Sequence, residues 1–390
     1  MNCVLDKSVS GISFDGFGVC NYCNNYKKNL PQMSNLHSSD DLDKLVSDIK
    51  EAGKGKDYDC LIGLSGGVDS SYLAYFAVGK LGLRPLTVHF DNGWNSSLAT
   101  ENVNKLVTSL KLELRTYVID WEEFRDIQLA YLKASVVDIE VPTDHFIMAV
   151  MHKYAHENKI KYILNGCNTS SESIMPKEWN FVKEDLANLI DIHQKFGERK
   201  LKRFPNFGLK QRLYFQYILG IKQIYPLNYI PYHIEEAKAF LAKEFGWQDH
   251  GGKHYESVWT RFYQGYILPK KFKIDKRKAH YSSLILSGQM DRKTALELLK
   301  EEPYPVKIQN QDVEYITRKL GLSEESFEKI MKSEPVSHLK FKTEYPHIEC
   351  WTKVFQIAEE FIFYFFRPLK ALGYIKYKVG SILKYFKIVS

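Results

Sequence analysis

Two glycines, three serines and one aspartate fall within residues 65–71, directly after the apolar run 58–64. The run predicts a buried strand, and the apolar periodicity over 68–80 predicts a helix. Gly66 and Gly67 permit a tight turn close to a ligand, and free N–H groups at the helix start attract an anion. The hydroxyls of Ser65, Ser70 and Ser71 are further possible donors to an anion. The carboxylate of Asp69 can hold Mg²⁺.

This loop differs from the Walker loop, because its spacing is shorter and no Lys follows the glycines. It resembles instead the Ser-Gly-Gly-x-Asp-Ser loop of the PP-loop ATP pyrophosphatases. That resemblance implies that the loop holds the β- and γ-phosphates of ATP and exposes the α-phosphorus to a substrate oxygen. The simpler alternative is a glycine-rich turn that binds nothing.

Strand and helix patterns alternate from residue 58 to residue 166. Further strands are predicted at 85–90, 114–119 and 162–166, and helices at 98–110, from Trp121 with Asp120 as its cap, and at 143–158. The alternation predicts an α/β fold with a doubly wound parallel sheet covered on both faces. Ligands bind at the carboxyl ends of such strands, so the loops at Ser65, Asp91 and Gly166 are expected to share one cleft.

The pattern divides the chain into four expected units. They are a Cys-rich, zinc-knuckle-like module (1–50), a PP-loop ATP-pyrophosphatase domain (51–205), a mainly helical domain for substrate and phosphate (206–350), and an aromatic, basic tail (351–390). After residue 205 the strand pattern fades and helical, aromatic stretches dominate. The helical domain is therefore expected to stand beside the sheet.

Cysteines are concentrated at the N-terminus, where Cys20 and Cys23 form a Cys-x-x-Cys knuckle and Cys3 supplies a third thiolate. A knuckle is half of a typical tetrahedral zinc site, so these three residues predict bound Zn²⁺. His37 or a residue from elsewhere in the fold could be the fourth ligand. The alternative is a set of reduced thiols with no metal.

The charge is unevenly distributed along the 390 residues. The net charge is +7, but residues 353–390 contain seven Lys or Arg and only two Glu, so the body is nearly neutral. A general nucleic-acid surface is therefore not indicated. No secretory leader or apolar run of roughly 18 residues is present, which predicts a cytoplasmic protein.

Four segments resemble one family more specifically, the N-acetyl sugar amidotransferases of bacterial surface-polysaccharide and pseudaminic acid pathways. They are residues 3–23, 65–71, 163–179 and 271–289. Two features depart from the family: the usual Cys three residues before Cys3 is missing, and the tail after residue 350 has no match.

The resemblance implies that ATP converts an acetamido group of a sugar or nucleotide sugar into an acetamidino group. The acetamido oxygen would attack the α-phosphorus, pyrophosphate would leave, and ammonia would replace the adenylated oxygen with release of AMP. The protein's tasks would then be to neutralise pyrophosphate, align the oxygen and exclude water.

Several further residues are candidates for the cleft. By resemblance, Lys276 and Arg277 contact phosphate, and the end of the second strand, with His89, Phe90 and Asp91, borders the adenosine. His254 and Glu256 stand at alternate positions and could act together as acid and base, although a lone His near aromatics is often structural. Glu172 and Trp179, with Pro176 between them, could form a sugar-facing loop.

The ammonia source is expected on another protein, because Cys3 lies behind Asn2 and no Gly-x-Cys-x-Gly elbow occurs. The resemblance implies a separate glutaminase with a cyclase-like ammonia-channelling subunit. The tail predicts either a helix docked on the enzyme or an amphipathic surface for a membrane or the glutaminase.

Two other functions remain open. A tRNA-thiolating PP-loop enzyme could use Cys167 as its persulfide carrier, and a non-enzymatic scaffold would bind ATP and zinc without exchanging pyrophosphate.

Overall fold

A five-stranded parallel sheet forms the centre of the computed structural model, which describes residues 2–33 and 39–347. The strands are β1 (Cys60–Gly63), β2 (Pro85–Asp91), β3 (Glu113–Val118), β4 (Tyr162–Leu164) and β5 (Lys222–Ile224). Their spatial order is β3-β2-β1-β4-β5, so the direction of winding reverses between β1 and β4. This is the predicted doubly wound α/β fold, and its switch point marks the expected ligand cleft.

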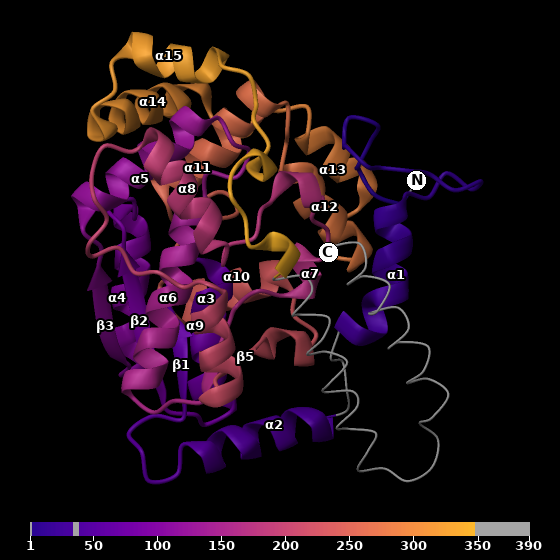
Figure 1. Cartoon of the computed structure of the whole chain (residues 1–390). Coiled ribbons are helices and arrows are strands. Elements are labelled where there is room, and N and C mark those ends of the chain that lie inside the picture. Colours follow the sequence, from indigo (N-terminus) through magenta and orange to yellow (C-terminus); the bar gives the residue numbers. More distant parts are fainter. Residues whose placement is uncertain (1, 34–38, 348–390) are drawn as a thin grey trace, which may run out of the picture.

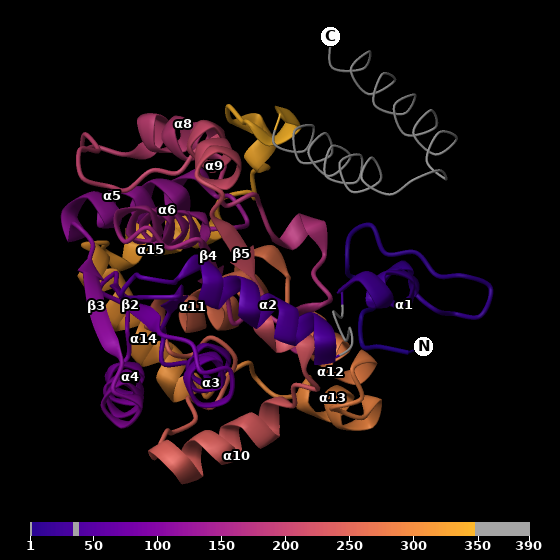
Figure 2. The ribbon, with the colours of Figure 1, turned by 90° about the horizontal axis from the view of Figure 1, so that it is seen from below.

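Helices cover both faces of the sheet, as Figure 2 shows from below. On one side lie α3 (Val68–Tyr75), α4 (Ser97–Leu110) and α10 (Ile234–Phe245), and on the other α5 (Trp121–Ala134), α6 (Val141–Glu157), α8 (Leu186–Phe196) and α9 (Leu209–Leu213). Because both faces are covered, β1 is apolar along its length, with Leu61 and Ile62 fully buried. The predicted cap of α5 is confirmed, since the Asp120 side chain accepts a hydrogen bond from Glu123 N.

The helix α2 (Ser39–Ala52) belongs to the sheet and not to the cysteine module. It crosses below the strands in Figure 1, and its Ile49 joins the apolar cluster that contains Cys60 and Leu83. The expected boundary at residue 50 therefore falls at the end of a helix that packs on the nucleotide domain.

The expected boundary at residue 205 also divides the sheet. Strand β5 lies after that residue and pairs in parallel with β4, in the register Ile163 to Gln223. The sequence analysis missed β5 because it is short and only its last residue is even half-buried, which leaves no apolar pattern to find. The helical part of the chain begins after β5.

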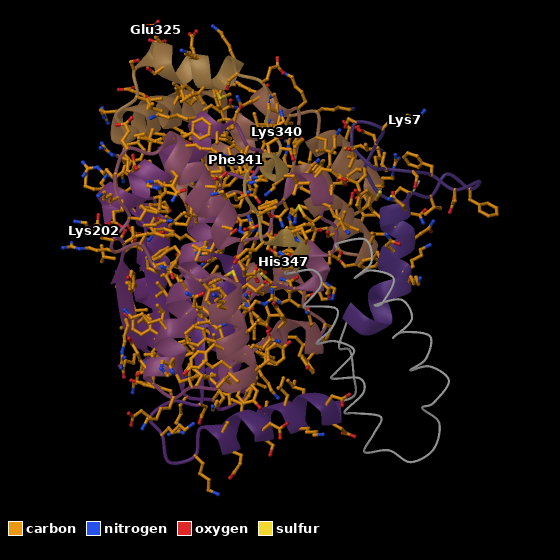
Figure 3. All side chains as sticks on the ribbon, in the orientation of Figure 1. Lys7, Lys202, Glu325, Lys340, Phe341 and His347 are labelled. Carbon is orange, nitrogen blue, oxygen red and sulfur yellow. The ribbon has the colours of Figure 1, made fainter. Side chains whose placement is uncertain are left out.

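Five helices of the C-terminal region pack on the cleft side of the sheet. They are α11 (Val258–Phe262), α12 (Arg277–Leu286), α13 (Arg292–Leu298), α14 (Val306–Leu320) and α15 (Glu324–Lys332). Trp259, Phe262 and Phe327 share one apolar core with Val88 of β2, so this region has no separate core in the described residues. Phe341 extends that core, whereas Lys202 and Glu325 lie at the edge of the molecule (Figure 3).

The cysteine module occupies residues 2–33 and ends in α1 (Asn21–Met33). It lies beside α12 and α13 in both views (Figures 1 and 2). Its apolar cluster joins Cys3, Leu5 and Cys23 to Trp179 and to Ala279 of α12. The module is thus packed on the C-terminal region, although the two lie far apart in the sequence.

None of the helices in the described residues is long and apolar enough to cross a membrane. The tail at 351–390, with both of its expected roles, lies outside the described residues, as does His37.

Candidate active site

The loop between β1 and α3 is the predicted phosphate loop, and its own hydroxyls hold its shape. Gly67 N donates to Ser65 Oγ at 3.2 Å, and Ser65 N donates to Ser70 Oγ at 3.2 Å. Gly66 has a φ of +85°, and a Cβ there would lie 2.4 Å from the carbonyl oxygen of Ala99. Only glycine fits this position, because an added side chain would be both strained and in collision. The hydroxyl of Ser71 is buried with no hydrogen-bond partner among the described residues.

A segment from the C-terminal half fixes the orientation of the Gly66 peptide. Its carbonyl oxygen accepts a hydrogen bond from Trp247 Nε1 at 2.9 Å and lies 3.1 Å from His250 Nε2. Asn102 of α4 contacts the same oxygen at 3.4 Å and accepts from Gln248 N at 3.0 Å. These contacts make residues 247–257 a wall of the cleft.

Asp69 sits on the first turn of α3, where the helix N-terminus favours a carboxylate. Three donors from distant parts of the chain converge on it. Tyr232 OH donates to Oδ1 at 2.7 Å, Asn168 Nδ2 donates to Oδ1 at 3.1 Å, and Lys253 Nζ donates to Oδ2 at 3.2 Å. Asp69, the predicted magnesium ligand, therefore connects the loop after β1 to the loop after β4 and to the C-terminal region.

Lys253 lies between two carboxylates, at 3.2 Å from Asp69 Oδ2 and 2.9 Å from Glu172 Oε1. Burial alone would raise the pKa of Glu172, but Lys253 and His254 reverse that effect and lower it to about 2. Burial opposes the charge on Lys253, yet the two carboxylates raise its pKa above its ordinary value. Glu172 and Lys253 are thus both charged over the whole physiological pH range.

The structure brings His254 and Glu256 together, as the sequence predicted. His254 Nδ1 lies 3.8 Å from Glu256 Oε1, and His254 Nε2 lies 3.6 Å from Glu172 Oε1. Burial disfavours the imidazolium, but the carboxylates of Glu256 and Glu172 together outweigh burial and raise the pKa of His254. Burial favours neutral Glu256, but His254 and His250 together outweigh burial and lower the pKa of Glu256. His254 also has a positive φ of 61°, a strained conformation for a non-glycine residue.

Glu256 reaches the phosphate loop itself. A Cβ on Gly67 would lie 2.9 Å from Glu256 Oε1, and Ser65 Oγ lies 3.4 Å from the same oxygen. Asp69, Glu172 and Glu256 therefore surround the loop with hard oxygen donors. Magnesium is commonly held by one or two carboxylates together with substrate phosphates, so these residues fit Mg²⁺ bound with ATP.

The loop after β4 meets the phosphate loop directly. A Cβ on Gly166 would lie 3.1 Å from Ser70 N, so this glycine allows the close approach. Asn168 then caps the short helix α7 (Thr169–Glu172), which carries Glu172 toward Lys253. Gly166 is thus where it was predicted to be.

The end of β2 serves mainly to brace the cleft. His89 is buried, with Nδ1 at 2.8 Å from Leu64 O and Nε2 at 3.0 Å from Asn95 Nδ2. Phe90 stacks edge-to-face on Phe146, and Asp91 Oδ1 accepts a hydrogen bond from Gly93 N in a turn. Their predicted contact with adenosine stays a prediction.

Two predicted phosphate ligands are in different situations. The Arg277 guanidinium is paired with the Asp275 carboxylate at 2.7 Å and also donates to Leu298 O, so its charge is already neutralised. Lys276 has no hydrogen-bonded or ion-paired partner within the described ranges, and its Nζ lies 5.4 Å from the centre of the Tyr263 ring. Burial lowers the pKa of Lys276, and the nearby carboxylates of Asp138 and Glu140 partly oppose that effect. Lys276 is therefore the freer cation of the two.

Trp179 is a core residue and not a sugar-facing one. Its side chain is 4% exposed and packs in the apolar cluster around Cys3 and Cys23. The sequence suggested a stacking platform because an aromatic ring next to a polar loop has the same pattern in both situations. Glu172, in contrast, does face the cleft.

The three predicted metal ligands converge in the cysteine module. The sulfurs of Cys3, Cys20 and Cys23 lie within 4.8 Å of one another, and all three residues are buried. The sulfurs of Cys3 and Cys20 are 3.6 Å apart, close to the ~3.8 Å edge of a tetrahedron with Zn–S bonds of about 2.3 Å. The residues therefore fit a single tetrahedral metal ion.

Sequence reasoning missed Lys253, Tyr232 and Asn168, although all three contact Asp69. Asn168 lies within residues 163–179, one of the segments that carry the family resemblance, and Lys253 directly precedes the candidate His254. Tyr232 could not be found, because its neighbours in the sequence carry no recognisable pattern.

Comparison with known proteins identifies two family matches. Residues 41–176 match the NAD synthase family, and residues 256–356 match the C-terminal domain of the WbpG-like LPS biosynthesis proteins. None of the curated proteins matches the chain.

Solved structures are similar to parts of this chain at low identity. The NH3-dependent NAD synthetase from Campylobacter jejuni is 20% identical with a TM-score of 0.27; the match covers 33% of this chain and 56% of that one, little more than half of it. The NMN synthetase from Francisella tularensis is 19% identical with a TM-score of 0.28, over 47% and 70% of the two chains. The U34-tRNA thiolase NcsA from Methanococcus maripaludis is 14% identical with a TM-score of 0.34, over 67% and 81%.

The two family matches cover both halves of the cleft described above: one includes the phosphate loop and Glu172, and the other begins at Glu256. They confirm the predicted resemblance. The chain therefore joins a nucleotide domain similar to the NAD synthases to a domain similar to the C-terminal domain of the WbpG-like LPS biosynthesis proteins, the combination expected of the N-acetyl sugar amidotransferases.

Proposed function

We propose that this protein is an ATP-dependent amidotransferase that converts the acetamido group of a bacterial sugar or nucleotide sugar into an acetamidino group. The observation that carries the proposal is a PP-loop whose glycine carbonyl and aspartate are held by residues 232–256, at the entry to the WbpG-like domain. The phosphate loop also lies against Glu256, the first residue of the WbpG-like match, which supports a reaction that involves both matched domains.

The proposed reaction has two steps. The acetamido oxygen attacks the α-phosphorus, the bond to the pyrophosphate oxygen breaks, and the amide proton is lost, which gives an O-adenylated imidate. Ammonia then adds to the imidate carbon, and AMP leaves with the original acetamido oxygen. The product has NH in place of O, so its mass falls by about one unit.

The residues of the cleft suit the first step. The N–H groups at the start of α3 and the hydroxyls of Ser65 and Ser70 offer donors to the leaving pyrophosphate. Mg²⁺, held by Asp69 with Glu172 or Glu256, would neutralise phosphate charge. Lys253 adds a fixed cation beside the loop, and Lys276 is available for an anionic part of the substrate.

His254 is suited to move a proton in this step. It lies between Glu172 and Glu256, at 3.6 and 3.8 Å, and both carboxylates stabilise its charged form. A group in this position can accept the amide proton as the oxygen becomes a nucleophile. Arg277 is left out of this mechanism, because Asp275 already neutralises it.

We also propose that Cys3, Cys20 and Cys23 hold one structural Zn²⁺. Their spacing and their burial in an apolar cluster support this, and a closed structural site would need a fourth ligand besides the three thiolates. Ammonia is proposed to come from a separate glutaminase with a cyclase-like channelling subunit.

The experiment that tests the reaction follows heavy oxygen from the substrate. Acetamido sugars linked to UDP or CMP, labelled with ¹⁸O in the acetamido group, are incubated with the full-length protein, ATP, Mg²⁺ and ammonium chloride. The expected result is unlabelled pyrophosphate, ¹⁸O in AMP and a sugar lighter than the unlabelled substrate by about one unit. Formation of ADP and phosphate, or label retained in the sugar, would contradict the adenylation mechanism.

The same experiment separates the alternatives. A tRNA-thiolating enzyme would need a reactive Cys167, but partial desolvation and the nearby Glu172 carboxylate raise the pKa of that thiol and so disfavour the thiolate. A non-enzymatic scaffold would bind ATP and form neither AMP nor pyrophosphate.

A further inference from the structure

A second group of charged side chains lies at the start of α6, and of its members the proposed reaction steps use only Lys276. Glu140 precedes α6 and is 7% exposed. Thr260 Oγ1 donates to Glu140 Oε2 at 3.1 Å, whereas Glu140 Oε1 is buried and has no hydrogen-bond partner among the described residues. Buried carboxylate oxygens are rarely left in this state, so Oε1 is available to a ligand that donates hydrogen bonds.

A second unpartnered oxygen lies on the same helical turn. The hydroxyl of Thr143, three residues after Glu140, is also buried without a partner within the part of the chain that the structure describes. Residues three apart at a helix start share one face. Two buried oxygens without partners among the described residues therefore lie on one face at the N-terminus of α6.

The fixed charges around Glu140 cancel. Lys183 Nζ pairs with Asp138 at 2.6 Å and with Asp144 at 3.1 Å, and the charge of Lys276 also acts on this group. The charges of these two aspartates and two lysines sum to zero. An ionised Glu140 therefore gives the cluster one net negative charge. Burial and the Asp144 carboxylate raise the pKa of Glu140 to about 7, despite the two lysines. The site lacks one positive charge, which a small cation or a proton would supply.

The cluster runs from the surface toward the phosphate loop. At the outer end, the side chain of Asp144 is 42% exposed and that of Lys183 is 18% exposed. At the inner end, Thr260 lies on α11, four residues after Glu256, whose carboxylate touches the phosphate loop. Glu140 is therefore linked through Thr260 to the segment that reaches the proposed adenylation site.

We propose that Glu140 binds ammonium and takes a proton from it, with Thr143 as the second acceptor. Ammonium is a small cation with four N–H donors, so it supplies both the missing charge and the missing hydrogen bonds. One N–H bond of ammonium breaks, its electron pair stays on nitrogen, and an O–H bond forms on Glu140. The ammonia released adds to the imidate carbon, and AMP leaves as described above. This inference rests on the proposed amidotransferase function.

A thermal-shift experiment tests the binding part without any sugar substrate. The probes are ammonium chloride, potassium chloride and choline chloride at equal ionic strength, with full-length wild type, Glu140→Gln and the matched control Glu344→Gln. Glu344 also has a buried carboxylate oxygen without a partner among the described residues, but it lies in the segment after α15. We expect ammonium to raise the melting temperature by about 2 °C or more over choline in wild type and the control, and not in Glu140→Gln.

Three results of that experiment would overturn the inference: no ammonium effect in wild type, an equal effect of potassium, or an effect that survives in Glu140→Gln. The glutamine variant is suitable because its side chain has the size of the Glu140 side chain and resembles the protonated, uncharged form of that carboxyl. Its near-ultraviolet circular dichroism is compared with wild type to verify the fold, and Glu140→Asp, which retains the acid, should regain part of the ammonium effect.

A kinetic experiment tests the proton-transfer part. Pyrophosphate exchange into ATP, driven by an acetamido nucleotide sugar without ammonia, reports the first step, and amidine formation reports both steps. In Glu140→Gln the ratio of amidine formation to exchange should fall at least tenfold, and the KM for ammonium should rise. An unchanged ratio would overturn the role of Glu140. Absence of exchange in wild type would instead overturn the proposed function, so the two failures are distinguishable.

Discussion

Ligand atoms gather in two regions of this chain, the cysteine cluster and the phosphate-loop cleft, which are built in contrasting ways. Cys3, Cys20 and Cys23 lie within the first 23 residues and are buried in an apolar cluster. The cleft collects Asp69, Glu172 and Lys253, which are 81 to 184 residues apart and pair with one another as charges. A short segment can enclose a metal by itself, but an anionic substrate needs donors from several loops.

The contrast predicts how each region responds to damage. Loss of a thiolate should affect folding of the module, since the sulfurs face one another in a core. Loss of a charge in the cleft should affect chemistry first, because the cleft is braced by many independent contacts. The predictions below test this difference, beginning with the largest expected effect.

The largest effect is expected from Asp69→Asn. The variant keeps the shape of the side chain but removes the anionic oxygen that faces Lys253. It should also weaken the binding of Mg²⁺ with ATP. Pyrophosphate exchange should fall by about 100-fold or more, because charge stabilisation at the phosphates is lost. The melting temperature, measured in parallel, should change little. Normal exchange in a folded variant would remove Asp69 from the site.

Lys253→Met should damage both stability and activity. It leaves Asp69 and Glu172 without their shared cation, and breaking a buried ion group costs about 3 kcal/mol in free energy of unfolding. Urea unfolding measures this loss. The double variant Lys253→Met/Glu172→Gln removes one of the two orphaned charges, so it should regain part of the stability but none of the exchange activity. A single variant as stable as wild type would show that the ion group is solvated.

Cys20→Ser tests the cysteine region. The variant should lose the single zinc expected in the wild type, as determined by metal analysis of the purified protein, and unfold at lower temperature. A chelator that strips zinc from the wild type should lower the melting temperature in the same way. Exchange per folded molecule should change much less than in Asp69→Asn. Wild-type protein without zinc or iron would leave the cluster as plain thiols.

The raised pKa of Glu140 predicts how stability depends on pH. A carboxyl whose pKa is higher in the folded than in the unfolded chain lowers the free energy of unfolding as pH rises, because the group ionises more easily after unfolding. Below about pH 4.5, the carboxyl is protonated in both states and this effect vanishes. Between that pH and about 7 the cost grows, so at pH 8 Glu140→Gln should be more stable than wild type by up to ~3 kcal/mol. Denaturant unfolding at pH 5 and 8 measures this, and a gain at pH 5 equal to that at pH 8 would contradict it.

The smallest effect is expected from Cys167→Ser. The thiol lies at the end of the cleft near Glu172, and the proposed amidotransferase reaction does not use it. Amidine formation should stay within about threefold of wild type, since removal of a group outside the reaction costs little. Complete loss of activity would favour a sulfur-transfer enzyme instead.

The order of elements and their local chemistry could be predicted from the sequence. The phosphate loop, Gly166 and the Asp120 cap are local patterns, because a glycine turn or a helix cap is decided within a few residues. The cysteine knuckle is local for the same reason. The convergence of His254 and Glu256 was predicted from their alternate spacing, although the conformation between them is strained at His254 and not a simple strand.

Other features were decided only by tertiary structure. Trp179 and Lys253 both lie near quoted motifs, yet one is buried in the cysteine module and the other stands between two carboxylates. Arg277 is neutralised by Asp275, while the ammonium of its neighbour Lys276 has no ion pair among the described residues and lies near the Tyr263 ring, since adjacent residues at a helix start point in different directions. β5 joined the sheet because β4 offered an open edge, not because its residues are apolar. The sequence by itself thus determined which side chains could bind a metal ion or phosphate. The long-range packing decided which of these side chains meet, since burial and charge pairing depend on partners that lie far apart along the chain.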